Sequence, residues 1–216
     1  PVNIGGVIVS RATLHNFSEI SNKDININDY VYVKRAGDVI PDIDRVELKK
    51  RQNIKKIIPP KKCPSCSREL KRENNQIALK CINNKKCIPQ IEGSIIHFIS
   101  RKGMNIIGIG NKIIKELIEK KLIKRTADIY QLGKDDFNRL ERVGAKSIKN
   151  YLSSIGASKK VSFHKFIYSL GIKEVGESSS KSLAIEFKTI DEFIQCTLDK
   201  LVDINDVGPI VAENII

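Results

Sequence analysis

The sequence predicts a multidomain α+β protein with a β-rich part, a small four-cysteine module and an all-α repeat array. Three observations predict this organisation. Strand-forming residues concentrate in residues 1–60, four cysteines cluster in residues 61–91, and residues 92–216 show helical periodicity with short glycine-containing breaks. The chain has 216 residues, which is enough for several small modules.

The β-rich part contains two stretches of strand-forming residues, Val2–Val9 and Asp29–Val33, with polar breaks between them. The dipeptides Gly37-Asp38 and Pro41-Asp42 have the composition of turns. We therefore expect short strands joined by tight turns in residues 1–60.

The cysteine cluster predicts a metal site. Cys63-Pro64-Ser65-Cys66 is followed by Cys81 and Cys87, with 14 residues between the two pairs. A CxxC turn directs two thiolates at one ion, and a second pair completes the tetrahedron that zinc prefers. Four cysteine ligands leave no open coordination position, so we expect a structural zinc ion that supplies most of the folding energy of this segment.

Two alternatives use the same cysteines. An iron–sulfur cluster is bound by four thiolates as well, and the four residues could also be unrelated buried cysteines. The fifth, Cys196, lies in the apolar stretch Phe193–Cys196 and is interpreted as a core residue. In a chain that opens without a signal peptide, this cysteine pattern favours metal binding over disulfides. It therefore also predicts a cytoplasmic location.

The helical part contains a repeat. Four segments align on a glycine that follows Ile or Val and opens a helix-forming stretch, and these segments are Ile106–Ile118, Leu140–Leu152, Ile172–Ala184 and Ile204–Ile216. The shared glycines are Gly110, Gly144, Gly176 and Gly208, spaced by 34, 32 and 32 residues. This spacing is typical of a helix–hairpin–helix array; a structural α-solenoid of tetratricopeptide type has a similar period and is the alternative.

Such hairpins suit a phosphate. A glycine lets the backbone approach closely, and the following helix directs free amides and its positive dipole end at the anion. Lys112 and Lys146 can add charge. We expect binding of the DNA backbone without sequence specificity, and a side chain at Gly110 is expected both to block the phosphate and to strain the hairpin.

The four hairpins are not equivalent in sequence. Only the first keeps two glycines, Gly108 and Gly110, whereas the others have Arg142, Glu174 and Asp206 at the first position. Because a carboxylate repels a phosphate, the third and fourth hairpins are expected to contribute less to binding.

The overall charge agrees with an anionic partner. The chain has a net charge of +13, and the cysteine segment is its most basic part, with eight basic and two acidic residues. A compositional preference for Lys, Ile and Asn explains part of this excess. No apolar run is long enough to cross a bilayer, and no membrane partner is expected.

Specific motifs extend this interpretation, and the chain resembles the C-terminal portion of bacterial NAD-dependent DNA ligases. The residues that carry the resemblance are Gly5–Asn16 (GGVIVSRATLHN), Arg35–Pro41 (RAGDVIP), the cysteine spacing, His97–Arg101 (HFISR) and Leu170–Ile172 (LGI). The match covers essentially the whole chain.

The resemblance implies an OB-fold domain at residues 1–60 without its first strand, a zinc finger at 61–91, and a helix–hairpin–helix domain at 92–216 whose fourth repeat is truncated. It also implies that Arg35 contacts a phosphate and that Val39 and Ile40 press on the duplex near a nick. Without the resemblance, Arg35 is a solvated strand-end charge, and Val39 and Ile40 are core residues.

The resemblance further implies a parent enzyme that seals nicked duplex DNA with NAD and magnesium through a lysyl-AMP intermediate. The family's KxDG motif does not occur in these 216 residues, so we expect no catalytic residue here. We also expect a monomer that works at the bacterial nucleoid.

His15, His97 and His164 have no Cys, Asp or Ser constellation beside them in the sequence and are not expected to be catalytic. A stand-alone, non-enzymatic DNA-binding protein is the alternative. A helix–hairpin–helix subunit of a repair nuclease is a third possibility, but the sequence has no cluster of carboxylates for metal-dependent cleavage.

Overall fold

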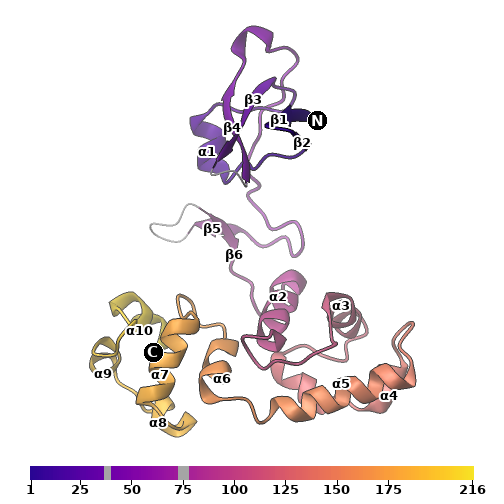
Figure 1. Ribbon diagram of the computed structural model, residues 1–216, viewed down its shortest axis with the longest axis vertical. Helices are drawn as coiled ribbons and strands as arrows, with labels where there is room; N and C mark the ends of the chain where they lie inside the picture. The colour runs from indigo at the N-terminus through magenta and orange to yellow at the C-terminus, as the bar shows by residue number, and fades with distance from the viewer. Residues whose placement is uncertain (37–39, 73–77) are drawn as a thin grey trace. The chain divides into compact units, whose positions relative to one another are not determined.

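The computed structural model describes residues 1–36, 40–72 and 78–216 and divides into two compact units, Pro1–Asn83 and Asn84–Ile216. Among the described residues, every strand lies in the first unit, and helices dominate the second (Figure 1). The predicted α+β class is therefore confirmed. The division falls inside the cysteine-bearing segment.

The first unit is built from short antiparallel pairs. Its elements are β1 (Val2–Ile4), β2 (Val7–Val9), α1 (Phe17–Asn22), β3 (Val31–Ala36), β4 (Ile40–Val46), the 3-10 helix η1 (Leu48–Lys50), β5 (Leu70–Arg72) and β6 (Leu79–Cys81). Three two-stranded sheets result, β1–β2, β3–β4 and β5–β6. Ile20 of α1, Ile25 and Ile43 of β4 form a small core.

The first strand-forming stretch is a hairpin rather than one strand. Gly5 and Gly6 have φ angles of 59° and 82° and turn the chain between β1 and β2, which pair from Val2 and Val9. Two successive left-handed residues match the twist of a two-residue hairpin turn. The pair of glycines was therefore the signal that divides Val2–Val9 into two strands.

An ion-pair network holds the end of this domain together. Arg51, after η1, donates to Asp29 at 2.8 Å and to Asp24 at 2.6 Å. These hydrogen bonds lower the pKa of both carboxyl groups, so both remain charged. The side chain of Asp29 is fully buried, which makes Arg51 its necessary counter-charge.

The second unit is helical throughout its described elements. These are α2 (Ile88–Ile99), α3 (Asn111–Glu119), the 3-10 helix η2 (Thr126–Gln131), α4 (Lys134–Asn138), α5 (Ala145–Ser158), α6 (Phe163–Ser169), α7 (Glu177–Glu186), α8 (Ile190–Ile194), α9 (Leu198–Val202) and α10 (Pro209–Ile215). None of the helices in the described part of the chain could span a membrane.

Two separate cores organise these helices. The first lies within residues 95–155 and includes Ile114, Leu117 and Phe137, all with no exposed surface. The second lies within residues 167–212 and is centred on Leu183 and Leu201. The repeat therefore folds as two pairs of hairpins, each pair around its own apolar centre.

Candidate nucleic-acid interface and metal site

All four hairpins have the same backbone geometry. Gly110, Gly144, Gly176 and Gly208 are the N-cap residues of α3, α5, α7 and α10, and all four are extended, with φ between −93° and −78°. Two residues earlier, the chain is left-handed in every hairpin, at Gly108 (94°), Arg142 (57°), Glu174 (63°) and Asp206 (63°). The hairpin turn is thus retained where its first glycine is lost, a result that residue type alone did not indicate.

The helix amides at these four N-caps are left without side-chain caps. Elsewhere in the chain, Asn16, Thr189 and Thr197 cap α1, α8 and α9 by accepting a hydrogen bond from a first-turn amide. The four hairpin glycines provide no such bond. The amides of the first turn are therefore available to an external anion, except that Pro209 removes one donor from α10.

The space in front of the glycines is open. A Cβ atom built at Gly110, Gly144, Gly176 or Gly208 meets no protein atom within 4 Å. The expectation that a side chain at Gly110 would strain the hairpin is therefore wrong, because its φ of −93° suits any residue. Only the expected obstruction of an approaching phosphate remains.

Gly108 has the structural role instead. Its φ of 94° lies in the left-handed region, and an added Cβ would lie 3.2 Å from Cε1 of Tyr151. Tyr151 belongs to α5, the helix of the second hairpin. Gly108 therefore permits both the turn and the close packing of the first two hairpins.

Hydrogen bonds join the hairpins within each pair. The Ile107 amide donates to Oγ of Ser154 at 2.6 Å, and the Glu141 amide donates to Glu116 at 2.8 Å. In the second pair, Ser178 donates to the Asp206 carboxylate at 2.7 Å. The carboxylate of Asp206, at the tip of the fourth hairpin, thus accepts a hydrogen bond from the third hairpin.

Charge differs sharply between the pairs. Residues 92–160 contain 15 basic and 7 acidic side chains, whereas residues 161–216 contain 5 basic and 9 acidic ones. Lys112 and Lys146 are both exposed in the first pair. In the second pair, Glu177 occupies the first turn of α7 and pairs with Lys102 at 3.0 Å and Lys181 at 3.2 Å, which lowers the pKa of its carboxyl group.

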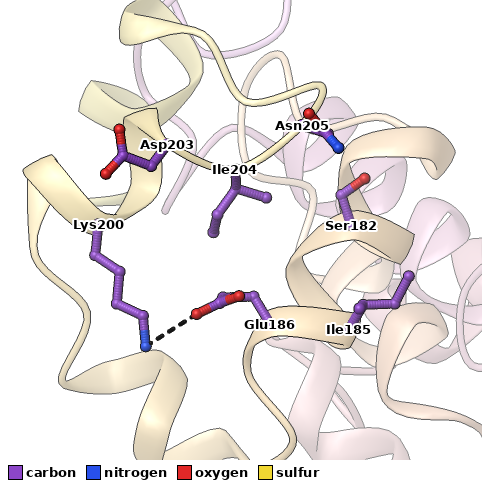
Figure 2. Close-up of a pocket in the computed structure, with 7 residues that line it drawn as sticks. All are labelled: Ser182, Ile185, Glu186, Lys200, Asp203, Ile204 and Asn205. Atoms are coloured by element: carbon purple, nitrogen blue, oxygen red, sulfur yellow. Dashed lines mark ion pairs between the residues drawn. The ribbon is translucent and has the colours of Figure 1, made fainter.

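A hollow in the second pair offers no comparable chemistry. It measures about 370 Å³ and lies between α7 and the segment around α9 (Figure 2). Its ammonium group, on Lys200, is paired with Glu186 at 3.2 Å. Asp203 adds a further negative charge at its edge, so the hollow is unsuited to a phosphate.

The four cysteines converge as the spacing predicted. The thiol sulfurs of Cys63, Cys66, Cys81 and Cys87 all lie within 4.8 Å of one another, and those of Cys66 and Cys81 are 3.5 Å apart. Sulfurs bound to one zinc ion at ~2.3 Å would be separated by about 3.8 Å. The cluster can hold a metal ion, and a set of four thiols fits zinc.

Local structure positions each ligand. A tight turn, in which Ser67 donates to the Cys63 carbonyl at 2.9 Å, directs the first two cysteines inward. Cys81 ends β6, and Cys87 is the N-cap of α2. The backbone hydrogen bond from Arg68 is the main cause that lowers the pKa of Cys66 to about 6, which favours the thiolate that a metal requires.

The predicted contacts of the first unit are only partly described. Arg35 lies in β3, where its backbone pairs with Pro41, but its side chain lies outside the described residues, as does Val39 altogether. Ile40 begins β4 and is 57% exposed. Ile40 is therefore not a core residue, whereas its contact with DNA stays a prediction.

The histidines differ from the sequence-based interpretation in one case. His15 has a carboxylate partner, because its Nε2 lies 3.2 Å from Asp42. The expectation of an isolated imidazole there is wrong, since 27 residues separate the two groups in sequence. His97 Nε2 bonds the Tyr168 carbonyl at 2.8 Å, and His164 contacts Ser162 at 3.5 Å.

Segments at both ends of the chain match the models of known protein families. Residues 1–55 match the NAD-dependent DNA ligase OB-fold domain, and residues 165–216 match the helix-hairpin-helix motif. A DNA ligase of Trichlorobacter lovleyi is 46% identical over 216 residues, which is 100% of this chain and 32% of the relative. DNA ligases of Legionella pneumophila (strain Corby) and Listeria monocytogenes (serotype 4b, strain CLIP80459) are 42% and 45% identical over 217 residues, with the same coverage.

The chain thus spans about a third of the length of these relatives, and the similarity runs through all of its segments. The OB-fold match covers the two motifs near Gly5 and Arg35, and the hairpin match covers the second pair of repeats. The whole chain is therefore similar to a portion of these DNA ligases, and its residues 1–55 are similar to the OB-fold domain of the NAD-dependent ones.

Proposed function

We propose that this chain is the DNA-binding, C-terminal portion of an NAD-dependent DNA ligase, an enzyme that seals nicks in duplex DNA during replication and repair. The observation that carries the proposal is the set of four glycine-capped helices with open space before their amides. Of the other helices, α1, α8 and α9 have side-chain caps, whereas α2, α4 and α6 do not; the four hairpin helices differ from these three by combining a glycine N-cap with open space and a repeated left-handed turn. Uncapped amides at repeated hairpins suit the phosphates of a duplex, which recur at regular intervals.

The two hairpin pairs have unequal shares in this role. The first pair combines available amides with a basic surface that includes Lys112 and Lys146. The second pair is acidic, has Glu177 in the first turn of α7 and lacks an amide at Pro209. The first pair therefore supplies most of the affinity, and the second completes the fold of the array.

The first unit contributes a second contact, through Arg35, Val39 and Ile40 near the nick. The exposure of Ile40 supports this assignment, because an exposed apolar side chain can press against the sugar–base surface of a minor groove. The binding partner is thus a nicked duplex, and the chain binds it as a monomer.

The four cysteines hold a structural zinc ion in this proposal. Their thiols fit the ion in number, type and separation. Zinc would cross-link the turn at Cys63 to β6 and to the start of α2 and thereby keep the segment folded. Elemental analysis of protein purified without chelators should find one zinc per chain, whereas metal-free or iron-containing protein would contradict the assignment.

The chemical steps belong to other parts of the parent enzyme, which would use NAD and magnesium. No KxDG motif occurs in the 216 residues, so the chain incubated with radiolabelled NAD should form no AMP adduct. A labelled protein band on a denaturing gel would contradict this division of labour.

DNA binding itself is tested by titrating a labelled nicked duplex at several salt concentrations. If the first two hairpins and Arg35 dominate, roughly three to six phosphates are engaged, and the slope of log affinity against log salt is about −3 to −5. Duplexes of different sequence should bind alike. A slope near zero would show that the array is a structural scaffold.

A further inference from the structure

His15 is part of a built constellation in the first unit. Its Nε2 lies 3.2 Å from one oxygen of Asp42, whose other oxygen lies 3.3 Å from the ammonium group of Lys23. Lys23 also pairs with Glu19 at 3.0 Å and donates to the Ile43 carbonyl at 2.6 Å. The Asp42 side chain is 12% exposed, whereas that of His15 is 48% exposed. The imidazole is therefore anchored on one side and open to solvent on the other.

The backbone at His15 is held in an uncommon conformation. Its φ of 53° is left-handed, which costs free energy at a residue with a Cβ atom and persists where the surroundings enforce it. The His15 amide donates to Oγ1 of Thr13 at 3.0 Å, and the Thr13 amide donates to the Pro41 carbonyl at 2.9 Å. These bonds hold the backbone of Thr13 and His15 beside the start of β4.

This place is close to the proposed nick contacts. Thr13 bridges to Asp42, and β4 begins two residues earlier at the exposed Ile40. The segment that carries His15 and the segment that carries Ile40 therefore lie side by side in the first unit. A duplex that meets Ile40 would therefore pass near His15, whose side chain is 48% exposed.

We propose that His15 is a further DNA-contact residue whose imidazole, oriented by Asp42, binds a backbone phosphate through Nδ1. The inference rests on the DNA binding proposed above. Within the described part of the chain, Nδ1 has no hydrogen-bond partner, whereas Nε2 lies 3.2 Å from Asp42. Anions at both nitrogens require a proton on each, so the contact is made by the imidazolium. Lys23 and the imidazolium together balance the charges of Asp42 and Glu19, so the group carries no net negative charge beside the phosphate.

The test compares imidazole-free variants of the full chain in the titration with labelled nicked duplex. His15→Asn is the primary variant, because Asn tolerates a left-handed backbone. It should bind about tenfold more weakly, the value of one hydrogen bond to a charged group, and its salt slope should be smaller by about 0.9. His15→Arg retains a cationic donor and should stay within about threefold of the unaltered chain. His164→Asn makes the same chemical change near the start of α6, ten residues before the turn residue Glu174 of the third hairpin, and should bind normally.

Thermal melting of each variant separates loss of contact from loss of fold. If His15→Asn melts early, His15→Gly removes the imidazole with no left-handed penalty and replaces it in the comparison. A folded imidazole-free variant with unchanged affinity and salt slope overturns the inference and leaves the proposed function standing. A folded His15→Arg as weak as His15→Asn also overturns it. An unaltered chain that does not bind duplex DNA overturns both proposals.

Discussion

Four single substitutions would separate DNA contact from folding in the hairpin array. Each of Gly110, Gly144, Gly176 and Gly208 is replaced by Val in turn. Because an added Cβ meets no protein atom within 4 Å at any of the four and every φ is ordinary for Val, the variants should fold equally well. The loss of a glycine N-cap costs at most about 1 kcal/mol. The four sites thus form an internally matched set.

Their effects on DNA affinity should differ. A side chain at Gly110 or Gly144 displaces a phosphate from one or two amides, each worth ~1.5 kcal/mol as a charge-assisted bond, so affinity should fall about 10- to 100-fold. In the acidic second pair, Gly176→Val should cost less than about threefold, and Gly208→Val should cost least because Pro209 has no amide. Lys112→Ala, which removes one exposed charge, should cost less than about fivefold.

The assay is anisotropy of a labelled nicked duplex at fixed salt, with circular dichroism and thermal melting of each variant. The reasoning fails if Gly110→Val is folded and binds normally. It fails equally if all four variants lose affinity to the same extent, because the charge difference between the hairpin pairs would then be irrelevant.

Three further outcomes follow from the structure. Cys81→Ser should abolish zinc binding and unfold the 61–91 segment, while far-ultraviolet circular dichroism still shows a helical array; retained zinc would contradict the ligand set. Gly108→Ala should lower the free energy of unfolding by about 1–3 kcal/mol, because φ is 94° and Tyr151 lies 3.2 Å from the new Cβ; an unchanged melting temperature would refute this. The pKa values of Asp24 and Asp29 are lowered by Arg51, so their stabilising contribution is complete above the usual carboxylate range and is lost as the pH falls below about 4. Arg51→Gln should therefore make stability less dependent on pH in that acid range, as acid-unfolding curves would show.

The local features of this protein were predictable from its sequence because their causes are local. The CxxC turn and the spacing to Cys81 and Cys87 predicted a convergence that the structure confirms. The repeated glycines predicted where each hairpin helix begins, because the N-cap of all four helices is a glycine and a glycine can be recognised directly in the sequence. Period-3.6 apolar residues likewise predicted helices such as α3 and α5.

Tertiary structure alone decided the rest. Arg142, Glu174 and Asp206 adopt left-handed turns although their residue types disfavour this conformation. Packing within each hairpin pair offsets the free-energy cost of that backbone. The division of the array into two cores, and the partnership of His15 with Asp42, depend on contacts between residues far apart in sequence. A sequence specifies such contacts only through the whole fold, because their free energy is gained only after the intervening chain has been ordered.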